Sequence, residues 1–184
     1  ITVTGLNPDS QQGDKVILDI LKRCGGKFKP VEGGLHFDRS LLKATEIDLA
    51  DCPDLGPILF TLGCFCSGET VIRNAGRLRL KESDRIEAMQ TELRKMGARI
   101  EVDGDTVHIQ GVALHAPNAP LSGHNDHRIV MALAVAAIAS GLPALLCGAE
   151  AVDKSWPAFW SVLRGLGAKV ELNTDKQEEF DIKA

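Results

Sequence analysis

The chain has 184 residues, 44% of them hydrophobic, which is enough to bury one substantial core, so one domain is the natural count. Its formal net charge of −4 argues against a general nucleic-acid-binding surface, and no stretch has the length or flanks of a transmembrane helix or signal peptide. The five cysteines include no C-x-x-C pair, which favours reduced thiols and a cytoplasmic location.

In chain order, the first predicted elements are a strand at residues 1–6 and a helix that ends at Gly25, where another strand begins. Asp54 is expected to cap a helix over residues 55–65, with a proline in its first turn. Residues 70–73 have the composition of a strand. This alternation of helices and strands is typical of α/β proteins.

The segment Lys81-Glu82-Ser83-Asp84-Arg85 brings two cations and two carboxylates to the start of the next predicted helix. Ser83 is expected as its N-cap, and apolar residues follow at helical spacing until Gly97. Free backbone N–H groups and the helix dipole attract anions at such a start, where Arg85 adds a bidentate donor. The segment therefore predicts an anion site with an acid beside it; a capped, solvated helix start is the alternative.

Similar starts recur further along the chain. After a predicted hairpin at residues 100–109, Asn125-Asp126-His127-Arg128 precedes an uncharged helical run that Gly141 ends. Lys154-Ser155-Trp156-Pro157 precedes the last predicted helix, with the proline in its first turn. Charged residues thus occur at more helix starts than capping alone requires, which favours an anion site over simple capped helix starts.

Other residues receive structural interpretations. One helix is expected to turn three charged residues to solvent: Glu92, Arg94 and Lys95. The last helix is expected to be anchored in the core by three aromatic residues: Trp156, Phe159 and Trp160. His124 and His127 have the spacing of a metal pair, but a third ligand at usable spacing is absent, so no metal site is predicted.

An internal repeat connects the helix starts. Gly25-Gly26-Lys27, Gly97-Ala98-Arg99 and Gly167-Ala168-Lys169 each end a helix and open a strand, at a spacing of roughly 70 residues. Such a repeat is too long for a solenoid and indicates α/β units around a pseudo-symmetry axis, with equivalent helix starts at one end. Residues 1–6 match the closing strand of a unit, so the sequence is expected to be part of a longer protein.

Three motifs then carry a family resemblance: Leu80 to Arg85, Asn125 to Arg128, and Asp153 to Pro157. Their order, their spacing and the repeat resemble the C-terminal half of the 5-enolpyruvylshikimate-3-phosphate (EPSP) synthase family over residues 1–172. The resemblance implies an α/β (α+β) fold of βαβαββ-type units, with helices buried around an axis and sheets outside. Residues 1–172 are expected to form this single domain, and residues 173–184, which lack an apolar period, a polar tail.

The same resemblance implies the reaction. An enolpyruvyl group passes from phosphoenolpyruvate to the 5-hydroxyl of shikimate 3-phosphate and phosphate is released, a step of aromatic amino acid biosynthesis. No metal or organic cofactor is implied. The active site of the family lies in a cleft between two domains, so the N-terminal domain of the same enzyme is the implied partner, and neither nucleic acid nor a membrane is one.

Residue roles follow from the matching motif positions. Asp54 resembles the residue that contacts the acceptor hydroxyls and serves as base, and Glu82 resembles the carboxylate of proton transfer at the methylene. The remaining implied substrate-binding residues are Lys81 at the shikimate ring, Arg85 and Arg128 at the phosphoenolpyruvate carboxylate, Lys154 at its phosphate, and Asp126 and His127 beside them. Arg77 departs from the pattern, because the family often has an amide there.

Three other functions are compatible with parts of the pattern. The enolpyruvyltransferase that acts on UDP-N-acetylglucosamine shares the fold, but the first two motifs together favour the shikimate enzyme. An RNA 3′-phosphate cyclase would need a late nucleophilic histidine, and no histidine follows His127. A non-catalytic ligand-binding or structural half domain is the alternative for the isolated chain, which is expected to be inactive alone and to self-associate through an open sheet edge.

Overall fold

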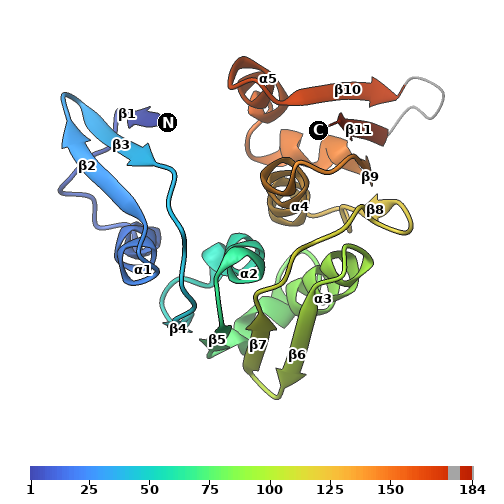
Figure 1. The fold of residues 1–184 in the computed structure, drawn as a ribbon, viewed down its shortest axis with the longest axis horizontal. Coiled ribbons are helices and arrows are strands. Elements are labelled where there is room, and N and C mark those ends of the chain that lie inside the picture. The colour runs from blue at the N-terminus through green and yellow to red at the C-terminus, as the bar shows by residue number, and fades with distance from the viewer. Residues whose placement is uncertain (174–178, 184) are drawn as a thin grey trace.

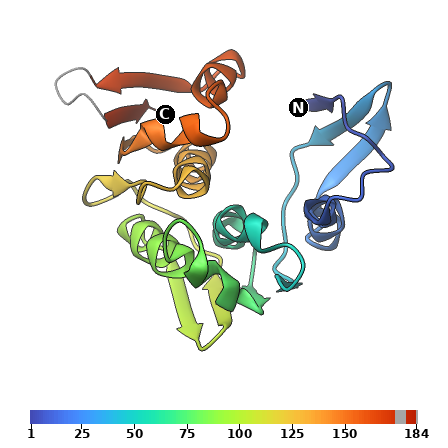
Figure 2. The same ribbon diagram turned by 180° about the vertical axis from the view of Figure 1, so that it is seen from behind.

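The computed structural model describes residues 1–173 and 179–183, arranged as three α/β units around a common axis (Figures 1 and 2). The first unit contains β1 (Thr2–Thr4), α1 (Ile17–Arg23), β2 (Lys27–Val31) and β3 (Gly34–Asp38). The second contains β4 (Glu46–Asp48), α2 (Gly56–Phe65), β5 (Glu69–Arg73), α3 (Arg85–Lys95), β6 (Arg99–Asp103) and β7 (Thr106–Gln110). The third contains β8 (Leu121–Ser122), α4 (His127–Ser140), β9 (Ala144–Cys147), α5 (Phe159–Gly165), β10 (Lys169–Asn173) and β11 (Glu179–Lys183).

The sheets repeat one strand order, which confirms the repeat predicted from the sequence. The second sheet runs β4-β5-β7-β6 and the third β8-β9-β11-β10, each with one parallel pair at its start and antiparallel pairs after it. The first sheet has the order β1-β3-β2, all antiparallel. Thus β1 takes the place that β5 and β9 have in the other two sheets, as expected for a closing strand.

Glycine ends the outer helix of each unit. Gly25, Gly97 and Gly167 have φ angles of +83°, +87° and +96°, which residues with a Cβ rarely adopt. Each turns the chain from a helix into the first strand of a hairpin, β2–β3, β6–β7 or β10–β11. The helix stops expected at these positions are therefore confirmed.

The inner helices α2 and α4 form the middle of the molecule, and the sheets lie outside them (Figure 1). The buried Thr61 hydroxyl of α2 donates to the Ala132 carbonyl of α4 at 3.0 Å, so the two helices are in direct contact. A Cβ at Gly63 would lie 3.1 Å from side-chain atoms of Ile109, so glycine allows α2 to lie close against β7. The α/β class with helices inside and sheets outside is confirmed.

Two expectations about the last unit are wrong. Residues 179–183 form β11 between β9 and β10 instead of a polar tail, because polar and apolar residues alternate there and Ile182 is buried. Residues 174–178 of the expected tail lie outside the described residues. Trp156 is 44% exposed rather than a core anchor, since it precedes the helix, whereas Phe159 and Trp160 are buried. The assignment of residues 1–172 to one domain stays a prediction.

Four short 3-10 helices complete the described chain: Gly13–Val16, Pro53–Leu55, Ala75–Leu80 and Ala149–Lys154. Three of them deliver residues of the candidate site, as described below. In the described ranges, every helix is too short or too polar to cross a lipid bilayer.

Candidate active site

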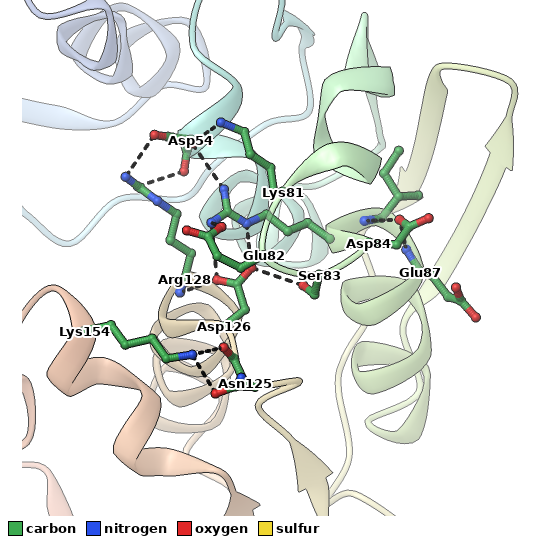
Figure 3. A network of polar contacts seen from close by, with 12 residues as sticks. Asp54, Lys81, Glu82, Ser83, Asp84, Glu87, Asn125, Asp126, Arg128 and Lys154 are labelled. Atoms are coloured by element: carbon green, nitrogen blue, oxygen red, sulfur yellow. Dashed lines mark hydrogen bonds and ion pairs between the residues drawn. The ribbon is translucent and has the colours of Figure 1, made fainter.

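The predicted site residues come from the second and third units and gather where α2, α3 and α4 begin (Figure 3). Asp54 lies in the 3-10 turn before α2, and Lys81 to Arg85 join the next 3-10 helix to α3. Asp126 to Arg128 open α4, and Lys154 ends the 3-10 helix Ala149–Lys154. The equivalent ends of successive units therefore meet, as the repeat predicted.

Two of the predicted caps are wrong, and the difference matters for the site. Asp84 rather than Ser83 caps α3, since its Oδ1 accepts from the backbone N–H groups of Ile86 and Glu87, both at 3.1 Å. The Ser83 hydroxyl instead donates to Asp126 Oδ2 at 3.1 Å. Asp54 makes no capping bond to α2. Both side chains are thus free to take part in contacts between helices.

Arg85 and Asp126 form the centre of the network. Arg85 is 1% exposed and Asp126 0%. Arg85 donates from Nε to Asp126 Oδ2 at 2.8 Å and from Nη2 to Oδ1 at 3.3 Å, a bidentate pair. Asp126 also caps α4 by accepting from the Arg128 backbone N–H at 2.9 Å. Burial acts to raise the pKa of Asp126, but the bonds from Arg85 and the α4 backbone outweigh it and hold the pKa below its usual value.

Asp54 connects three cations. Its Oδ1 accepts from Lys81 Nζ at 3.0 Å and from Arg85 Nη1 at 3.2 Å, and its Oδ2 from Arg128 Nη2 at 3.1 Å. Arg128 also donates to the Asp54 backbone carbonyl at 3.0 Å. Burial acts to raise the pKa of this carboxyl, but the Lys81 hydrogen bond and the three charges outweigh it, so the pKa lies below its usual value. Asp54 is therefore ionised at neutral pH.

Glu82 lies at the exposed edge of the network. Its side chain is 46% exposed, and its Oε2 accepts from Arg85 Nη2 at 2.5 Å. The Arg85 guanidinium thus makes four hydrogen bonds to carboxylates, of the five that its N–H groups can donate. An incoming anion can engage Arg85 fully only by displacing one of these carboxylates.

Lys154 reaches the network through its neighbour in space, Asn125. Its Nζ donates to the Asn125 backbone carbonyl and to Asn125 Oδ1, both at 2.6 Å (Figure 3). The expectation that Lys154 and Pro157 directly open the last helix is wrong, because α5 begins at Phe159 after a turn. Lys154 nevertheless lies beside Asp126, since Asn125 precedes that residue.

His127 is the first residue of α4, and its Nδ1 is buried without a hydrogen-bond partner in the described part of the chain. Within residues 1–173 and 179–183, no three His, Cys, Asp or Glu side chains form a group that could hold a metal ion. The charged side chains of the site are suited to binding anions and moving protons. Its four cations (Lys81, Arg85, Arg128 and Lys154) face three carboxylates (Asp54, Glu82 and Asp126), which leaves one excess positive charge.

One residue behind the site contradicts its sequence-based interpretation. Glu92 was expected on a solvated face, but it is buried and accepts hydrogen bonds from Lys95, Ser122 and His124. Its position between Met89, Leu93 and Met96 on the apolar stripe of α3 is the signal that could have revealed the burial. The sequence pattern indicates no role for Asn125 and only a capping role for Ser83, although Asn125 holds Lys154 and Ser83 contacts Asp126.

The fold and the network define a repeated α/β domain with a cationic cluster at one end, and comparisons identify its family. The chain belongs to the EPSP synthase (3-phosphoshikimate 1-carboxyvinyltransferase) family, whose model matches residues 1–163. This confirms the family predicted from the three motifs.

Relatives with curated names and solved structures agree with this assignment. The chain is 44% identical over 170 residues to a 3-phosphoshikimate 1-carboxyvinyltransferase of Clostridium acetobutylicum, covering 92% of this chain and 39% of the relative. It is 40% identical over 173 residues to the enzyme of the same name from Methanocaldococcus jannaschii, covering 94% and 40%. An EPSP synthase structure from Acinetobacter baumannii has a TM-score of 0.74 and 26% identity, covering 89% and 41%. The chain thus spans about two fifths of the length of these relatives.

Proposed function

We propose that the chain supplies the C-terminal half of the active site of a 3-phosphoshikimate 1-carboxyvinyltransferase. The observation that supports this most is the network in which Asp54 joins Lys81, Arg85 and Arg128 at the helix starts of two units. The reaction transfers the enolpyruvyl group of phosphoenolpyruvate to the 5-hydroxyl of shikimate 3-phosphate. Both substrates are anions, which a cluster of cations with excess positive charge is suited to bind.

The chemistry needs two proton transfers. The methylene carbon of phosphoenolpyruvate gains a proton while the hydroxyl oxygen forms a bond to its C2 carbon, and the hydroxyl proton is lost. The resulting tetrahedral adduct then loses a proton from the methyl group, and the bond to the phosphate oxygen breaks, which restores the double bond and releases phosphate. A carboxylate near the hydroxyl and a proton-transfer group near the methylene can carry out these steps.

Asp54 is suited to the acceptor hydroxyl. Three cations hold it ionised, and a carboxylate in that state accepts a hydrogen bond from a hydroxyl group. A ligand carboxylate that engages Arg85 and Arg128 would draw both cations away from Asp54. The pKa of Asp54 would then rise toward the value that a general base needs.

Glu82 is suited to proton transfer at the methylene. Its half-exposed carboxylate lies at the rim of the network and contacts Arg85, which we propose binds the phosphoenolpyruvate carboxylate together with Arg128. We place Lys154 at the phosphate, Lys81 at the shikimate ring, and Asp126 and His127 beside them. Arg77 donates to the Ala50 carbonyl at 3.1 Å, and we assign it no substrate contact.

The chain by itself is inactive under this proposal, because it spans 39% of its Clostridium acetobutylicum relative and the N-terminal part of such a protein would supply the rest of the site. Self-association through the open edge of the three-stranded first sheet belongs to the same proposal. Gel filtration over a range of concentrations measures it.

The test compares the chain alone with a fusion that places the N-terminal part of the Clostridium acetobutylicum relative ahead of it. Phosphate release from both substrates is expected from the fusion and not from the chain. In the fusion, Glu82→Gln should lower kcat by on the order of 10²–10⁴-fold with little effect on phosphoenolpyruvate binding. Glu87→Gln makes the same charge change at an exposed position of α3 and is the matched control. Release by the chain alone, or near-normal turnover of Glu82→Gln, contradicts the proposal.

A further inference from the structure

A buried carboxylate behind the site has no part in the proposed reaction. The Glu92 side chain, on α3, is 2% exposed. One cation contacts it, because Lys95 Nζ lies 2.7 Å from Glu92 Oε2. The same oxygen accepts from the Ser122 backbone N–H at 2.8 Å, and Oε1 is 3.0 Å from Nε2 of His124. Burying a carboxylate costs free energy unless hydrogen bonds and a counter-charge compensate for the lost water. The burial of Glu92 therefore depends on the positions of these three partners.

The partners of Glu92 belong mainly to one segment, the turn from Ser122 to Asp126 that joins β8 to α4. Lys95 also donates to the Pro120 carbonyl at 2.9 Å, just before β8. Within the turn, the His124 backbone N–H donates to Ser122 Oγ at 3.2 Å and that of Asp126 to the Gly123 carbonyl at 2.9 Å. Glu92 therefore ties this turn to α3 from behind.

The turn has an unfavourable backbone. His124 and Asn125 have φ angles of +49° and +53°, two successive residues in the left-handed region. That region is disfavoured for residues with a Cβ, although asparagine tolerates it better than most. Two such residues in succession persist only when their surroundings hold them. The bond between Glu92 and His124 holds the first of the two directly.

The front of the same turn carries the proposed binding site. Asn125 accepts two hydrogen bonds from Lys154, and Asp126 holds Arg85. A change in the conformation of the turn would therefore move the lysine that we place at the phosphate and the aspartate that orients the buried arginine. In a packed site, a displacement of 1 Å is sufficient to weaken function strongly.

We infer that Glu92 is a positioning residue, which acts through His124 and Asn125 to hold Lys154 at the phosphate of the substrate. The identity of the ligand rests on the proposed function, whereas the link from Glu92 to Lys154 does not. The bond to His124 has a direct spectroscopic signature. A carboxylate can only accept, so neutral His124 must carry its proton on Nε2.

The first experiment uses the 184-residue chain and nitrogen NMR of His124 at a pH at which the spectrum shows a neutral imidazole. Glu92→Gln can place its amide oxygen on Ser122 and its NH₂ on His124, which moves the imidazole proton from Nε2 to Nδ1. The Lys154 ammonium signals should stay in place, so the conservative variant preserves the position of the lysine. Glu87→Gln, at an exposed position of the same helix, should leave the tautomer unchanged.

The second experiment removes the link. Glu92→Leu and His124→Asn should accelerate hydrogen exchange at Ser122 and Asp126, whose backbone N–H groups are bonded in the turn, and shift the Lys154 ammonium signals. In the fusion protein, both should weaken phosphoenolpyruvate binding by on the order of tenfold, with a smaller change in kcat. If Glu92→Leu does not fold, His124→Asn decides, because asparagine tolerates the left-handed backbone and loses only the ring.

The outcomes separate the two proposals. An unchanged Lys154 signal in folded His124→Asn, or an unchanged tautomer in Glu92→Gln, overturns the positioning role whatever the ligand is. If the unmodified fusion binds no phosphoenolpyruvate, the proposed function fails, while the tautomer and exchange measurements still support or overturn the positioning role.

Discussion

Arg85 and Arg128 stand at the starts of neighbouring helices and share Asp54, yet their surroundings differ. The Arg85 side chain is 1% exposed and contacts Asp54, Glu82 and Asp126. The Arg128 side chain is 31% exposed, and all of its hydrogen-bond partners in the described residues belong to Asp54. The same residue type therefore has two environments: Arg85 joins the helix starts through three carboxylates, whereas the Arg128 side chain hydrogen-bonds to Asp54 alone among the described residues and stays partly exposed.

The largest expected effect is on stability. Arg85→Met should lower the free energy of unfolding by roughly 3–5 kcal/mol, because it leaves Asp126 buried without its cation. Arg128→Met should lower it by about 1 kcal/mol or less, since its partner Asp54 keeps Lys81 and Arg85. Urea denaturation of the two variants of the chain measures both values. Equal losses would mean that the difference in burial has no energetic consequence.

The next largest effect is on ligand binding, and here the variant of the more exposed arginine, Arg128, is the informative one. In the fusion protein, Arg128→Ala should raise the Michaelis constant for phosphoenolpyruvate before it lowers kcat. The lost charge-assisted hydrogen bonds are worth roughly 1.5–3 kcal/mol. Arg128→Lys should recover only part of this, because lysine lacks the planar fork that binds a carboxylate at two points. Steady-state kinetics with varied phosphoenolpyruvate is the measurement, and an unchanged Michaelis constant in Arg128→Ala would remove Arg128 from the binding site.

The dependence of the free energy of unfolding on pH should report the buried carboxylate of Asp126. The pKa of Asp126 in the folded chain lies below the ordinary value of 3.8, so its contribution is complete above that value and is lost as the pH falls through the folded-state pKa. The free energy of unfolding should therefore fall below about pH 4, by at most about 1.4 kcal/mol per pH unit for this group. Asp126→Asn should reduce that slope. An unchanged slope would assign the acid sensitivity to other carboxylates.

The smallest effect concerns Ser83. Ser83→Ala should lower the free energy of unfolding by about 1 kcal/mol through its lost bond to Asp126. Its signature is that the loss disappears in an Asp126→Ala background, where a cap would still contribute. Asp84→Ala, which removes the true cap of α3, should cost about 1 kcal/mol in both backgrounds. If Ser83→Ala, like Asp84→Ala, lowered the free energy of unfolding equally in both backgrounds, Ser83 would act as a cap instead.

Local patterns in the sequence predicted most of the framework. The uncharged run before Gly141 corresponds to α4, and the glycine stops and the hairpin β6–β7 lie where expected. The short strands β4 and β8 were not predicted, because two or three residues carry too little pattern and their parallel pairing depends on distant segments.

The site was predicted less completely. The charged helix starts identified its location, but serine and aspartate are almost equally good caps, so the choice between Ser83 and Asp84 was not available locally. Asp126, far along the chain, decides it by binding the Ser83 hydroxyl. The burial of Glu92 likewise depends on a turn that another unit contributes. A local sequence pattern does not predict side-chain contacts between different units of the fold.

The position of β11 gives the C-terminal end an importance beyond its length. Because β11 lies between β9 and β10, a polypeptide shortened to residue 172 would lose the strand that joins the two. The third sheet would then be split, and the backbone groups of β9 and β10 that now pair with β11 would be left free. Expression of the shortened form should yield a protease-sensitive, aggregating product, although every residue assigned to the site is retained.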